Sequence, residues 1–378
     1  MRIMLVTEYY PPHVGGVEVV FSTLARELVK RGHECHVVTC RVPNSKKYEE
    51  FEGAKVHRIN VPRRNDRYWF ALLATPTALK IARHVDLIHT TTFTGAIPAW
   101  VVSKLLRKKC VITVHEVWSG LWSDLAEMNC VSARFHRFLE RAIISLNFDK
   151  YVCVSRYTRN CLRLLGIKDK KLQVIYNGID YEFFNPSKAD VTAVRAKFGT
   201  GNNFVYMYYG RAGISKGLEY LIQAVPLISK DIPNSRLLLI LGDEPKDRRK
   251  HIIEMISSLR IEKQIILLRP VPKNELPSYI AASDCVVVPS LSEGFGFTAA
   301  EACAMERPIV STDVASLPEV VSGKHVLVSP RSPDEIARAV SKVYHGDVET
   351  SLKKIFTWDE CVEKYLKVYQ GDGLWGVT

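Results

Sequence analysis

The sequence predicts an α/β protein with two domains, each built around a largely parallel β-sheet. Its 378 residues are too many for one compact core of the usual size. Short apolar runs alternate with amphipathic stretches along the whole chain, which is the pattern of repeated βα units. The runs are almost continuously apolar, as is typical of parallel strands covered on both faces.

The first half of the chain is expected to contain seven strands and several helices. The expected strands are residues 3–7, 35–39, 55–59, 87–90, 111–114, 151–154 and 172–175. Amphipathic spacing predicts helices between them, for example over residues 18–30 and 131–146. In the second half we expect strands at residues 204–208, 236–241, 265–268, 285–289 and 308–311.

A turn-rich segment near the middle of the chain marks the predicted domain boundary. Residues 177–186 read NGIDYEFFNP, and Asn-Gly and Asn-Pro pairs are typical of turns. We therefore expect one domain over residues 1–185 and a second domain that begins at residue 186. Ligands of open parallel sheets bind beyond the carboxyl ends of the strands, so we expect the functional site at these ends, in a cleft between the domains.

The charge is concentrated in the first half. The formal net charge is +12, and residues 1–187 contain 28 Lys and Arg against 17 Asp and Glu. Such a surface attracts phosphates, anionic lipids or nucleic acid, because the Coulomb attraction does not depend on the partner's identity. A merely solvated basic face is the alternative.

The cysteines and apolar runs indicate a cytoplasmic protein. The nine cysteines include no CxxC pair and no His partner at zinc spacing, so we expect reduced thiols and no metal site. No run approaches the roughly 18 apolar residues that span a bilayer. Residues 1–7 are too short for the apolar part of a signal peptide, and read as a first buried strand.

Gly15 and Gly16 stand before the first predicted helix. Paired glycines there let a phosphate or sugar approach the backbone, where the helix N-terminus supplies N–H donors. The pair does not fit the dinucleotide pattern GxGxxG. Two glycines that merely ease a turn are the alternative.

Residues 210–217, GRAGISKG, follow the strand at 204–208 and open a predicted helix. Arg211 and Lys216 would place two cations at the carboxyl end of a strand, which suits a diphosphate. The P-loop pattern GxxxxGK[ST] does not fit, because Gly217 follows the lysine. Two solvated loop cations are the alternative.

His115 follows the strand at 111–114. At that end of a strand it can donate a hydrogen bond to a sugar hydroxyl or a leaving-group oxygen, or carry a proton. The zinc motif HExxH is excluded, because Ser119 occupies the position of the second histidine. A buried core histidine is the alternative.

Residues 292–302, SEGFGFTAAEA, carry two glutamates after the strand at 285–289. Gly294 and Gly296 would let backbone N–H groups approach a ligand beside Glu293. Thr298 and Glu301 fit the capping box [ST]xxE, which could explain Glu301 by helix capping alone. Capping offers no explanation for Glu293.

Taken together, these motifs resemble family 4 of the glycosyltransferases, retaining enzymes of the GT-B fold that use nucleotide-sugars. The resemblance covers nearly the whole chain. It rests on an ordered set of motifs: YYPPHVGGVE at 9–18, VH at 114–115, VS at 154–155, YNGID at 176–180, GR at 210–211, KG at 216–217, and Glu293 with Glu301.

The resemblance implies a role for each donor-site residue. Glu301 would accept hydrogen bonds from the ribose hydroxyls, and Glu293 would contact hydroxyls of the transferred sugar. Arg211 and Lys216 would hold the diphosphate. Backbone N–H groups of four further residues would bind sugar hydroxyls: Gly294, Phe295, Gly296 and Phe297.

The resemblance also implies the domain organisation and the remaining roles. Residues 1–185 would bind the acceptor and residues 186–355 the donor, while residues 356–378 would form a helix that crosses back onto the first domain. His115 would lie near the donor sugar and its leaving group, and Gly16 near the diphosphate or the acceptor.

The implied reaction is the retaining transfer of a hexosyl group without a metal or another cofactor. A UDP-sugar is the default donor, with GDP and ADP left open. Two departures from the family pattern concern the nucleobase: residues 242–245 read GDEP where Gly-x-Gly is usual, and residues 269–271 read RPV where a glycine is usual.

The acceptor could be a soluble sugar, a glycan or a lipid-linked molecule. Residues 63–70, RRNDRYWF, and 104–109, KLLRKK, mix cations with apolar side chains. This composition suits peripheral binding to an anionic membrane from the cytoplasm. Nucleic acid is not expected, because no aromatic RNA-binding motif is present. A nucleotide-sugar-binding protein, or another GT-B enzyme such as an epimerase, is the alternative function.

Overall fold

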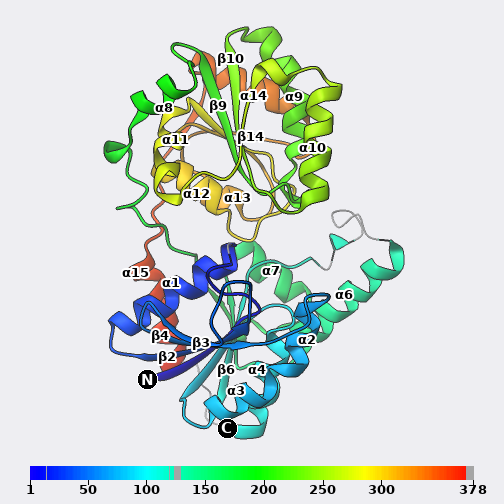
Figure 1. The fold of residues 1–378 in the computed structure, drawn as a ribbon, viewed down its shortest axis with the longest axis vertical. Helices are drawn as coiled ribbons and strands as arrows, with labels where there is room; N and C mark the ends of the chain where they lie inside the picture. Colours follow the sequence, from blue (N-terminus) through cyan, green and yellow to red (C-terminus); the bar gives the residue numbers. More distant parts are fainter. Residues whose placement is uncertain (14, 119, 123–128, 372–378) are drawn as a thin grey trace. The chain divides into compact units, whose positions relative to one another are not determined.

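The computed structural model describes residues 1–13, 15–118, 120–122 and 129–371, which fold as two compact units (Figure 1). Unit 1 contains the described residues up to Gly178 together with those from Trp358 onward, and unit 2 contains Ile179–Thr357. Each unit is a mostly parallel β-sheet with helices packed on its faces.

The sheet of unit 1 has eight strands in the order β3-β4-β2-β1-β5-β6-β7-β8. Only β3 runs antiparallel to its neighbour. The strands are β1 (Arg2–Val6), β2 (Glu34–Cys40), β3 (Tyr48–Phe51), β4 (Ala54–Ile59), β5 (Leu87–Thr91), β6 (Lys109–Val114), β7 (Lys150–Cys153) and β8 (Leu172–Val174). The helices of the unit are α1 (Gly16–Lys30), α2 (Asp66–Leu73), α3 (Thr75–Ala82), α4 (Ala96–Leu106), α6 (Cys130–Ser145), α7 (Arg156–Leu164), the short η1 (Asp169–Lys171) and α15 (Trp358–Gln370).

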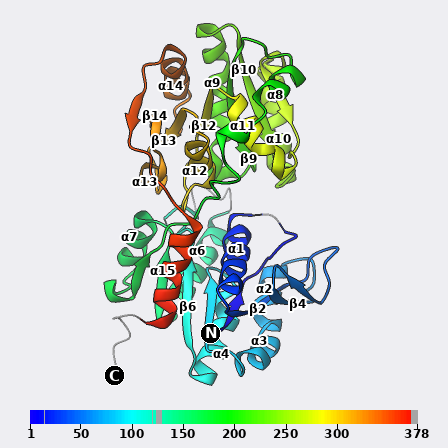
Figure 2. The ribbon, with the colours of Figure 1, turned by 90° about the vertical axis from the view of Figure 1, so that its left-hand side faces the viewer.

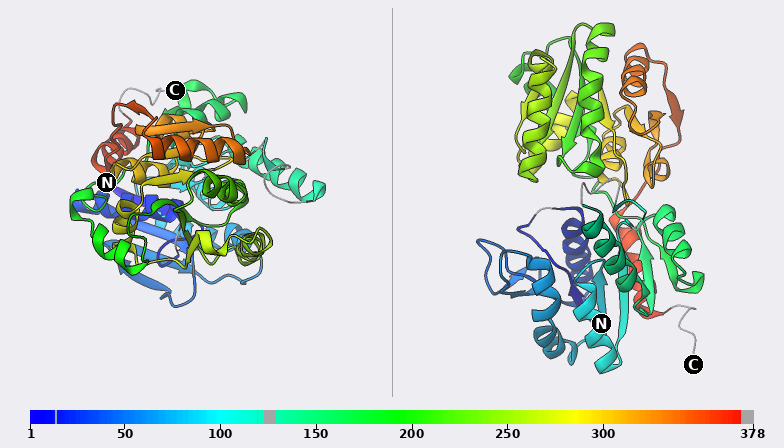
Figure 3. Two further views of the ribbon diagram at one scale, coloured as in Figure 1. Left: turned by 90° about the horizontal axis from the view of Figure 1, so that it is seen from above. Right: turned by 90° about the vertical axis from the view of Figure 1, so that its right-hand side faces the viewer.

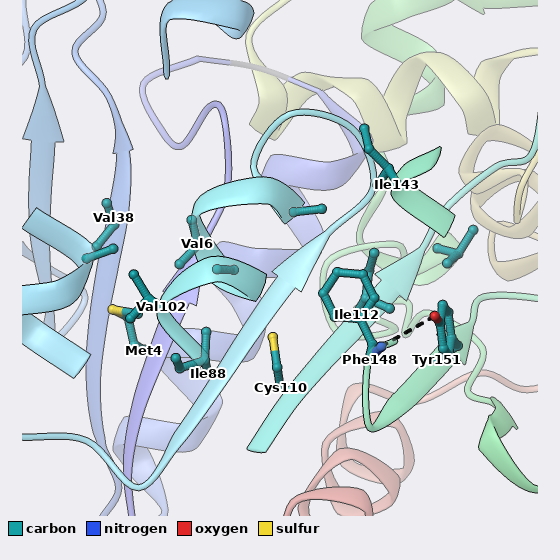
Figure 4. Close-up of a cluster of buried hydrophobic side chains, with 14 of the residues drawn as sticks. Met4, Val6, Val38, Ile88, Val102, Cys110, Ile112, Ile143, Phe148 and Tyr151 are labelled. Atoms are coloured by element: carbon teal, nitrogen blue, oxygen red, sulfur yellow. Dashed lines mark hydrogen bonds between the residues drawn. The ribbon is translucent and has the colours of Figure 1, made fainter. Parts of the chain in front are cut away.

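The core of unit 1 lies between its sheet and the covering helices. Met4 and Ile88 on neighbouring strands are fully buried, and Figure 4 shows them beside Val102 of α4. Such burial removes apolar surface from water, which stabilises the fold by about 25 cal/mol per Å². The buried hydroxyl of Tyr151 has backbone partners: it donates its hydrogen to the carbonyl of Ile144 at 2.9 Å and accepts from the amide of Phe148 at 3.4 Å (Figure 4).

Helix α15 packs in unit 1, although it follows the whole of unit 2 in the sequence (Figure 2). Its tyrosines reach buried polar groups of the sheet, since Tyr369 Oη lies 2.7 Å from His89 Nδ1 and Tyr365 Oη lies 2.9 Å from Thr113 Oγ1. Beside it, a Cβ on Gly178 would lie 2.5 Å from the backbone of Trp358. Only glycine therefore fits where the outgoing and returning chain segments touch.

The sheet of unit 2 has seven strands in the order β11-β10-β9-β12-β13-β14-β15, and only β15 is antiparallel to its neighbour. Figure 3 shows its helices on both faces. The strands are β9 (Phe204–Gly210), β10 (Ser235–Leu241), β11 (Ile265–Leu268), β12 (Cys285–Val288), β13 (Ile309–Thr312), β14 (Gly323–Val328) and β15 (Glu349–Ser351). The helices are η2 (Pro186–Lys188), α8 (Val191–Lys197), η3 (Ile214–Lys216), α9 (Leu218–Asp231), α10 (Lys246–Ser258), η4 (Glu262–Gln264), η5 (Lys273–Glu275), α11 (Leu276–Ala282), α12 (Phe297–Ala304), α13 (Leu317–Val320) and α14 (Pro333–His345).

All twelve expected strands are present, each within two residues of its expected ends. Three further strands, β3, β14 and β15, were not predicted. Within the described residues, none of the helices has the length and apolar character needed to cross a bilayer.

Candidate functional site

Two loops meet at the carboxyl edge of the unit 2 sheet because their strands, β9 and β12, are neighbours. The amide of Leu291, after β12, donates to the carbonyl of Ser215, after β9, at 2.7 Å. Gly217 has a φ of +59°, and a Cβ there would lie 2.1 Å from the carbonyl oxygen of Pro289. The two loops therefore approach so closely that only glycine fits at this position.

This approach brings together Lys216 and Glu293, which lie 77 residues apart in the chain. Lys216 Nζ lies 2.6 Å from Glu293 Oε1, and both side chains are largely shielded from solvent. The same carboxylate oxygen accepts from Ser290 Oγ at 2.9 Å, while Ser316 Oγ donates to the backbone carbonyl of Glu293 at 3.0 Å. A charged, oriented pair thus occupies the edge of the sheet where a polar ligand would bind.

Glu301 faces the same sheet from α12. Its Oε2 accepts from the hydroxyl of Tyr209, on β9, at 2.9 Å. Desolvation raises the pKa of Glu301 to about 7, although the hydrogen bond from Tyr209 acts in the opposite direction. The same burial, together with the nearby carboxylate, raises the pKa of Tyr209 well above its ordinary value.

The capping-box explanation of Glu301 is wrong. Helix α12 begins after Gly296, which has a φ of +92° and provides no side-chain cap. Thr298 therefore lies inside the first turn, and the carboxylate of Glu301 contacts Tyr209 instead of the helix N-terminus.

The segment between the two glutamates is ordered by aromatic packing. Phe295 is buried, with ring centroids 5.3 Å from Phe297 and 5.4 Å from Phe356. Gly294 lies between this aromatic anchor and Glu293. The segment leads into the N-terminus of α12, whose first N–H groups have no partner within a helix.

Arg211 is exposed directly after β9. Its backbone and side chain pack over Gly242, where a Cβ would lie 3.4 Å from Arg211 Cγ. The loops after β9 and β10 therefore also meet at this edge. Lys216 and Arg211 give the edge two cations.

Unit 1 carries a separate pocket of about 190 Å³ at the carboxyl edge of its own sheet. His115 and Thr91 line it at the ends of adjacent strands β6 and β5. In the described structure, His115 Nε2 and Thr91 Oγ1 are both buried without a hydrogen-bond partner. Buried polar atoms are usually satisfied, so two such atoms in one pocket suit a hydroxyl-bearing ligand.

The imidazole of His115 is uncharged at neutral pH. Burial lowers its pKa to about 4, and the nearby Glu18 carboxylate only partly offsets this effect. A neutral imidazole can donate a hydrogen bond from one ring nitrogen and accept one at the other.

Three carboxylates also line this pocket: Glu8, Glu18 and Glu116. Glu8 Oε1 accepts from the amide and hydroxyl of Thr94, at 2.6 and 2.7 Å, just before α4 begins. Helix α1 begins at Gly16, two residues before its expected start, and Glu18 lies in its first turn, with Oε1 2.8 Å from His13 Nδ1. Negative charge next to Gly16 makes this end of α1 better suited to a sugar hydroxyl than to a phosphate.

The sequence predictions missed the residues that hold the site residues in place. The hydrogen bonds to Glu293 and Glu301 come from three residues that no local sequence pattern indicates: Tyr209, Ser290 and Ser316. Glu8 does carry a signal, since it closely follows an apolar strand, as His115 does.

Comparison with known proteins identifies both halves of the chain. The Glycosyltransferase Family 4 profile matches residues 14–183, and the Glycosyl transferases group 1 profile matches residues 190–355. The chain belongs to the family 4 glycosyltransferases. The predicted family is therefore confirmed.

Similar proteins support the same assignment. An uncharacterized glycosyltransferase of Methanocaldococcus jannaschii is 27% identical, with 98% of each chain covered. A GDP-mannose-dependent phosphatidylinositol monomannoside mannosyltransferase of Mycolicibacterium smegmatis is 26% identical, over 89% of this chain and 88% of that protein.

Solved structures confirm the GT-B fold. Anabaena HepE in complex with UDP-glucose superposes with a TM-score of 0.80 at 19% identity, and covers 98% of this chain and 100% of that one. As a member of family 4, which the two profile matches show, the enzyme transfers a sugar from a nucleotide-sugar.

Proposed function

We propose that the edge site of unit 2 binds the nucleotide-sugar and that the enzyme transfers its sugar with retention of anomeric configuration. The observation that carries the proposal is the convergence of Lys216, Glu293 and Glu301 on the carboxyl ends of β9 and β12. Such a donor requires three groups: a cation for the diphosphate, a carboxylate for the sugar and a carboxylate for the ribose.

Charge stabilisation accounts for the proposed chemistry at this site. As the bond between the anomeric carbon and the phosphate oxygen breaks, negative charge grows on the diphosphate. Lys216 and Arg211 stabilise that charge, which is the role a divalent cation would otherwise fill. The acceptor oxygen forms its bond on the same face of the sugar, and its proton passes to the departing phosphate.

Glu293 and the segment Gly294–Phe297 are assigned to the transferred sugar. The carboxylate of Glu293 already accepts a hydrogen bond from a serine and pairs with Lys216, so a sugar hydroxyl would be its further donor. Because Lys216 contacts Glu293 directly, sugar and diphosphate would bind side by side, as they are joined in the donor.

A UDP-sugar is the proposed donor. The fold shared with HepE, whose structure holds UDP-glucose, supports this choice. The mycobacterial relative is named for GDP-mannose, so GDP-sugars form the second donor class to test.

The pocket of unit 1 is assigned to the acceptor side of the reaction. His115 offers a neutral imidazole and an unpartnered Nε2 to a hydroxyl, and Gly16 is exposed at the start of α1, next to Val17, which lines the same pocket. The name of the mycobacterial relative supports a lipid-linked acceptor. The nine free cysteines, seven of them buried, suit action in the cytoplasm.

The proposal is tested by measuring the release of nucleoside diphosphate from four donors: UDP-glucose, UDP-N-acetylglucosamine, GDP-mannose and ADP-glucose. We expect turnover with one donor class, unchanged by EDTA, and a loss of at least a hundredfold in Lys216→Ala and in Glu293→Ala. Lys230→Ala, an exposed lysine at the far end of α9, is the matched control.

Two outcomes would contradict this proposal. Wild-type turnover in both site variants would show that the chemistry lies elsewhere. Saturable donor binding without any release of nucleoside diphosphate, even with candidate acceptors, would favour a binding protein or an epimerase.

A further inference from the structure

The pocket of unit 1 has room for a single ring. Its volume of about 190 Å³ lies below the roughly 300 Å³ at which pockets for drug-sized ligands begin. Tyr9, Phe93 and Trp118 contribute aromatic side chains to its wall. An aromatic wall suits the C–H face of a sugar or cyclitol ring, whose edge carries the hydroxyl groups.

Two buried atoms in this pocket have unused hydrogen-bonding capacity. Thr91 Oγ1 and His115 Nε2 form no hydrogen bond within the described structure. A ligand hydroxyl can use such atoms, because it both donates and accepts a hydrogen bond. Buried polar atoms that stay unsatisfied cost free energy, so a hydroxyl-bearing ligand is favoured here over an apolar one.

The charges that line the pocket are unequal. Among the described residues, three carboxylates line it, those of Glu8, Glu18 and Glu116, and one guanidinium, that of Arg67. The side chains of Glu8 and Glu18 are 11% and 10% exposed, whereas that of Arg67 is 53% exposed. Water therefore screens the positive charge more strongly than the negative charges.

Arg67 is also engaged by its neighbours. Its Nε lies 3.7 Å from Glu8 Oε2, and its guanidinium carbon lies 5.3 Å from the centroid of the Tyr9 ring. Burial raises the pKa of Glu8, and the charge of Arg67 acts in the opposite direction. Even with a proton on Glu8, the carboxylates of Glu18 and Glu116 outnumber the one guanidinium.

We propose that this pocket selects, as the acceptor, a sugar or cyclitol ring that carries no phosphate or carboxylate group. The carboxylates of the pocket accept hydrogen bonds from the hydroxyls of such a ring, and they repel an anionic substituent that enters with it. The inference rests on the proposed function, which assigns the pocket to the acceptor, and it adds the class of ring that reacts. A phosphate farther along a lipid-linked acceptor would lie outside the pocket.

Saturation-transfer difference NMR on the full chain tests the proposal without any donor. The ligands are matched pairs at pH 8, where histidine side chains are ordinarily uncharged: glucose with glucose 6-phosphate, mannose with mannose 6-phosphate, and myo-inositol with inositol 1-phosphate. We expect at least one uncharged ring to bind. Its phosphorylated counterpart should bind at least about tenfold more weakly, because like charges in a shielded pocket repel each other.

Glu116→Gln tests the source of this selectivity. The amide keeps the shape of the side chain and can still accept a hydrogen bond, but it has no negative charge. Binding of the phosphorylated ring should therefore strengthen about threefold to tenfold relative to binding of its uncharged counterpart. Glu50→Gln, at an exposed carboxylate on β3, changes the net charge equally and should leave both affinities unchanged.

Thr91→Val tests the polar contact. Valine matches the shape of threonine but lacks the hydroxyl, so binding of the uncharged ring should weaken about threefold to tenfold. The Tm should stay the same or rise, because the hydroxyl has no partner to lose within the described structure. A purely structural role of the hydroxyl would instead lower the Tm. Thr350→Val, at an exposed position on β15, is the control.

Three results would overturn the inference. The first is a phosphorylated ring that binds as tightly as its uncharged counterpart, and the second is a wild-type chain that binds none of the uncharged rings. The third is an unchanged ratio of the two affinities in Glu116→Gln. Selective ring binding without turnover of any nucleotide-sugar would support the selectivity of the pocket and contradict the proposed function. Turnover with a ring phosphate as the preferred acceptor would contradict this inference and leave the proposed function in place.

Discussion

Among single residues, Glu301 makes the clearest prediction about pH. Its pKa lies near 7 in the folded chain and near 4.5 when unfolded, because burial disfavours the charged carboxylate. Between these values the folded state binds more protons, so this group's contribution to stability is present below pH 4.5 and is lost as pH rises to about 7. The free energy of unfolding of the wild type should therefore fall relative to Glu301→Gln over this window.

Urea unfolding at pH 5 and pH 8 measures this difference. Glu301→Gln should gain stability over the wild type on going from pH 5 to pH 8, since the amide has no charge to desolvate. Glu306→Gln, at an exposed carboxylate just beyond α12, is the control and should show no such gain. An equal pH response in wild type and Glu301→Gln would contradict the account of Glu301.

The identity of Glu301's partner could not be predicted from the sequence. The spacing of Thr298 and Glu301 fits a capping box, but where α12 begins is decided by Gly296 and its left-handed backbone. A Cβ on Gly296 would lie 2.9 Å from Leu317 Cδ2, so a contact with α13 favours glycine there. That contact depends on tertiary packing, which no local motif reports.

At the scale of elements, Gly217 holds the β9 and β12 loops together. Gly217→Ala would place a methyl group against the Pro289 carbonyl in a left-handed conformation, and should cost about 2–4 kcal/mol of stability. Gly199→Ala is a matched control, because Gly199 also has a φ of +59° but a Cβ added there would meet no atom within 4 Å. It should cost only about 1–2 kcal/mol.

Denaturant unfolding measures the loss of stability in each variant. The difference between the two losses is the cost of placing a methyl group against the β12 loop. Since Gly217 follows Lys216 directly, Gly217→Ala should also weaken donor binding, whereas Gly199→Ala should not. Equal losses of stability in the two variants would mean that the loops are not held together at this point.

Strands that read as apolar runs were predictable, whereas the three missed strands, β3, β14 and β15, each contain charged or polar residues. β12 reads as an unbroken apolar run, CVVV, because it is buried at every residue. The missed strands β3 (YEEF) and β15 (ETS) each lie at one end of a sheet, where every side chain is exposed or half-buried. Because solvent contacts these strands, β15 has no apolar residue and β3 has only Tyr48 and Phe51, which is too little for an apolar run.

For the whole molecule, the order of strands decides which predicted residues meet. Lys216 and Glu293 were each predicted from a loop after a strand, but their ion pair follows from β9 lying next to β12. The sequence motifs predict that a residue lies at the carboxyl end of a sheet. Which of these residues lie next to each other is decided by which strands pair, and the paired strands can be far apart in the sequence.

The division of the chain into two units assigns different chemistry to each. Unit 2 offers cations and carboxylates suited to a nucleotide-sugar, and unit 1 offers a pocket with a neutral histidine. The central claim is that the donor binds at the edge of the unit 2 sheet through Lys216 and Glu301.

Isothermal titration calorimetry at pH 8 tests that claim most directly, because Glu301 is then ionised and can accept the ribose hydroxyls. With UDP-glucose and GDP-mannose as ligands, we predict saturable binding of one donor class at one site per chain. Binding should weaken at least tenfold in Lys216→Ala and in Glu301→Gln and stay unchanged in Lys230→Ala. Undiminished binding in both site variants, or no binding of either nucleotide-sugar to the wild type, would contradict the claim.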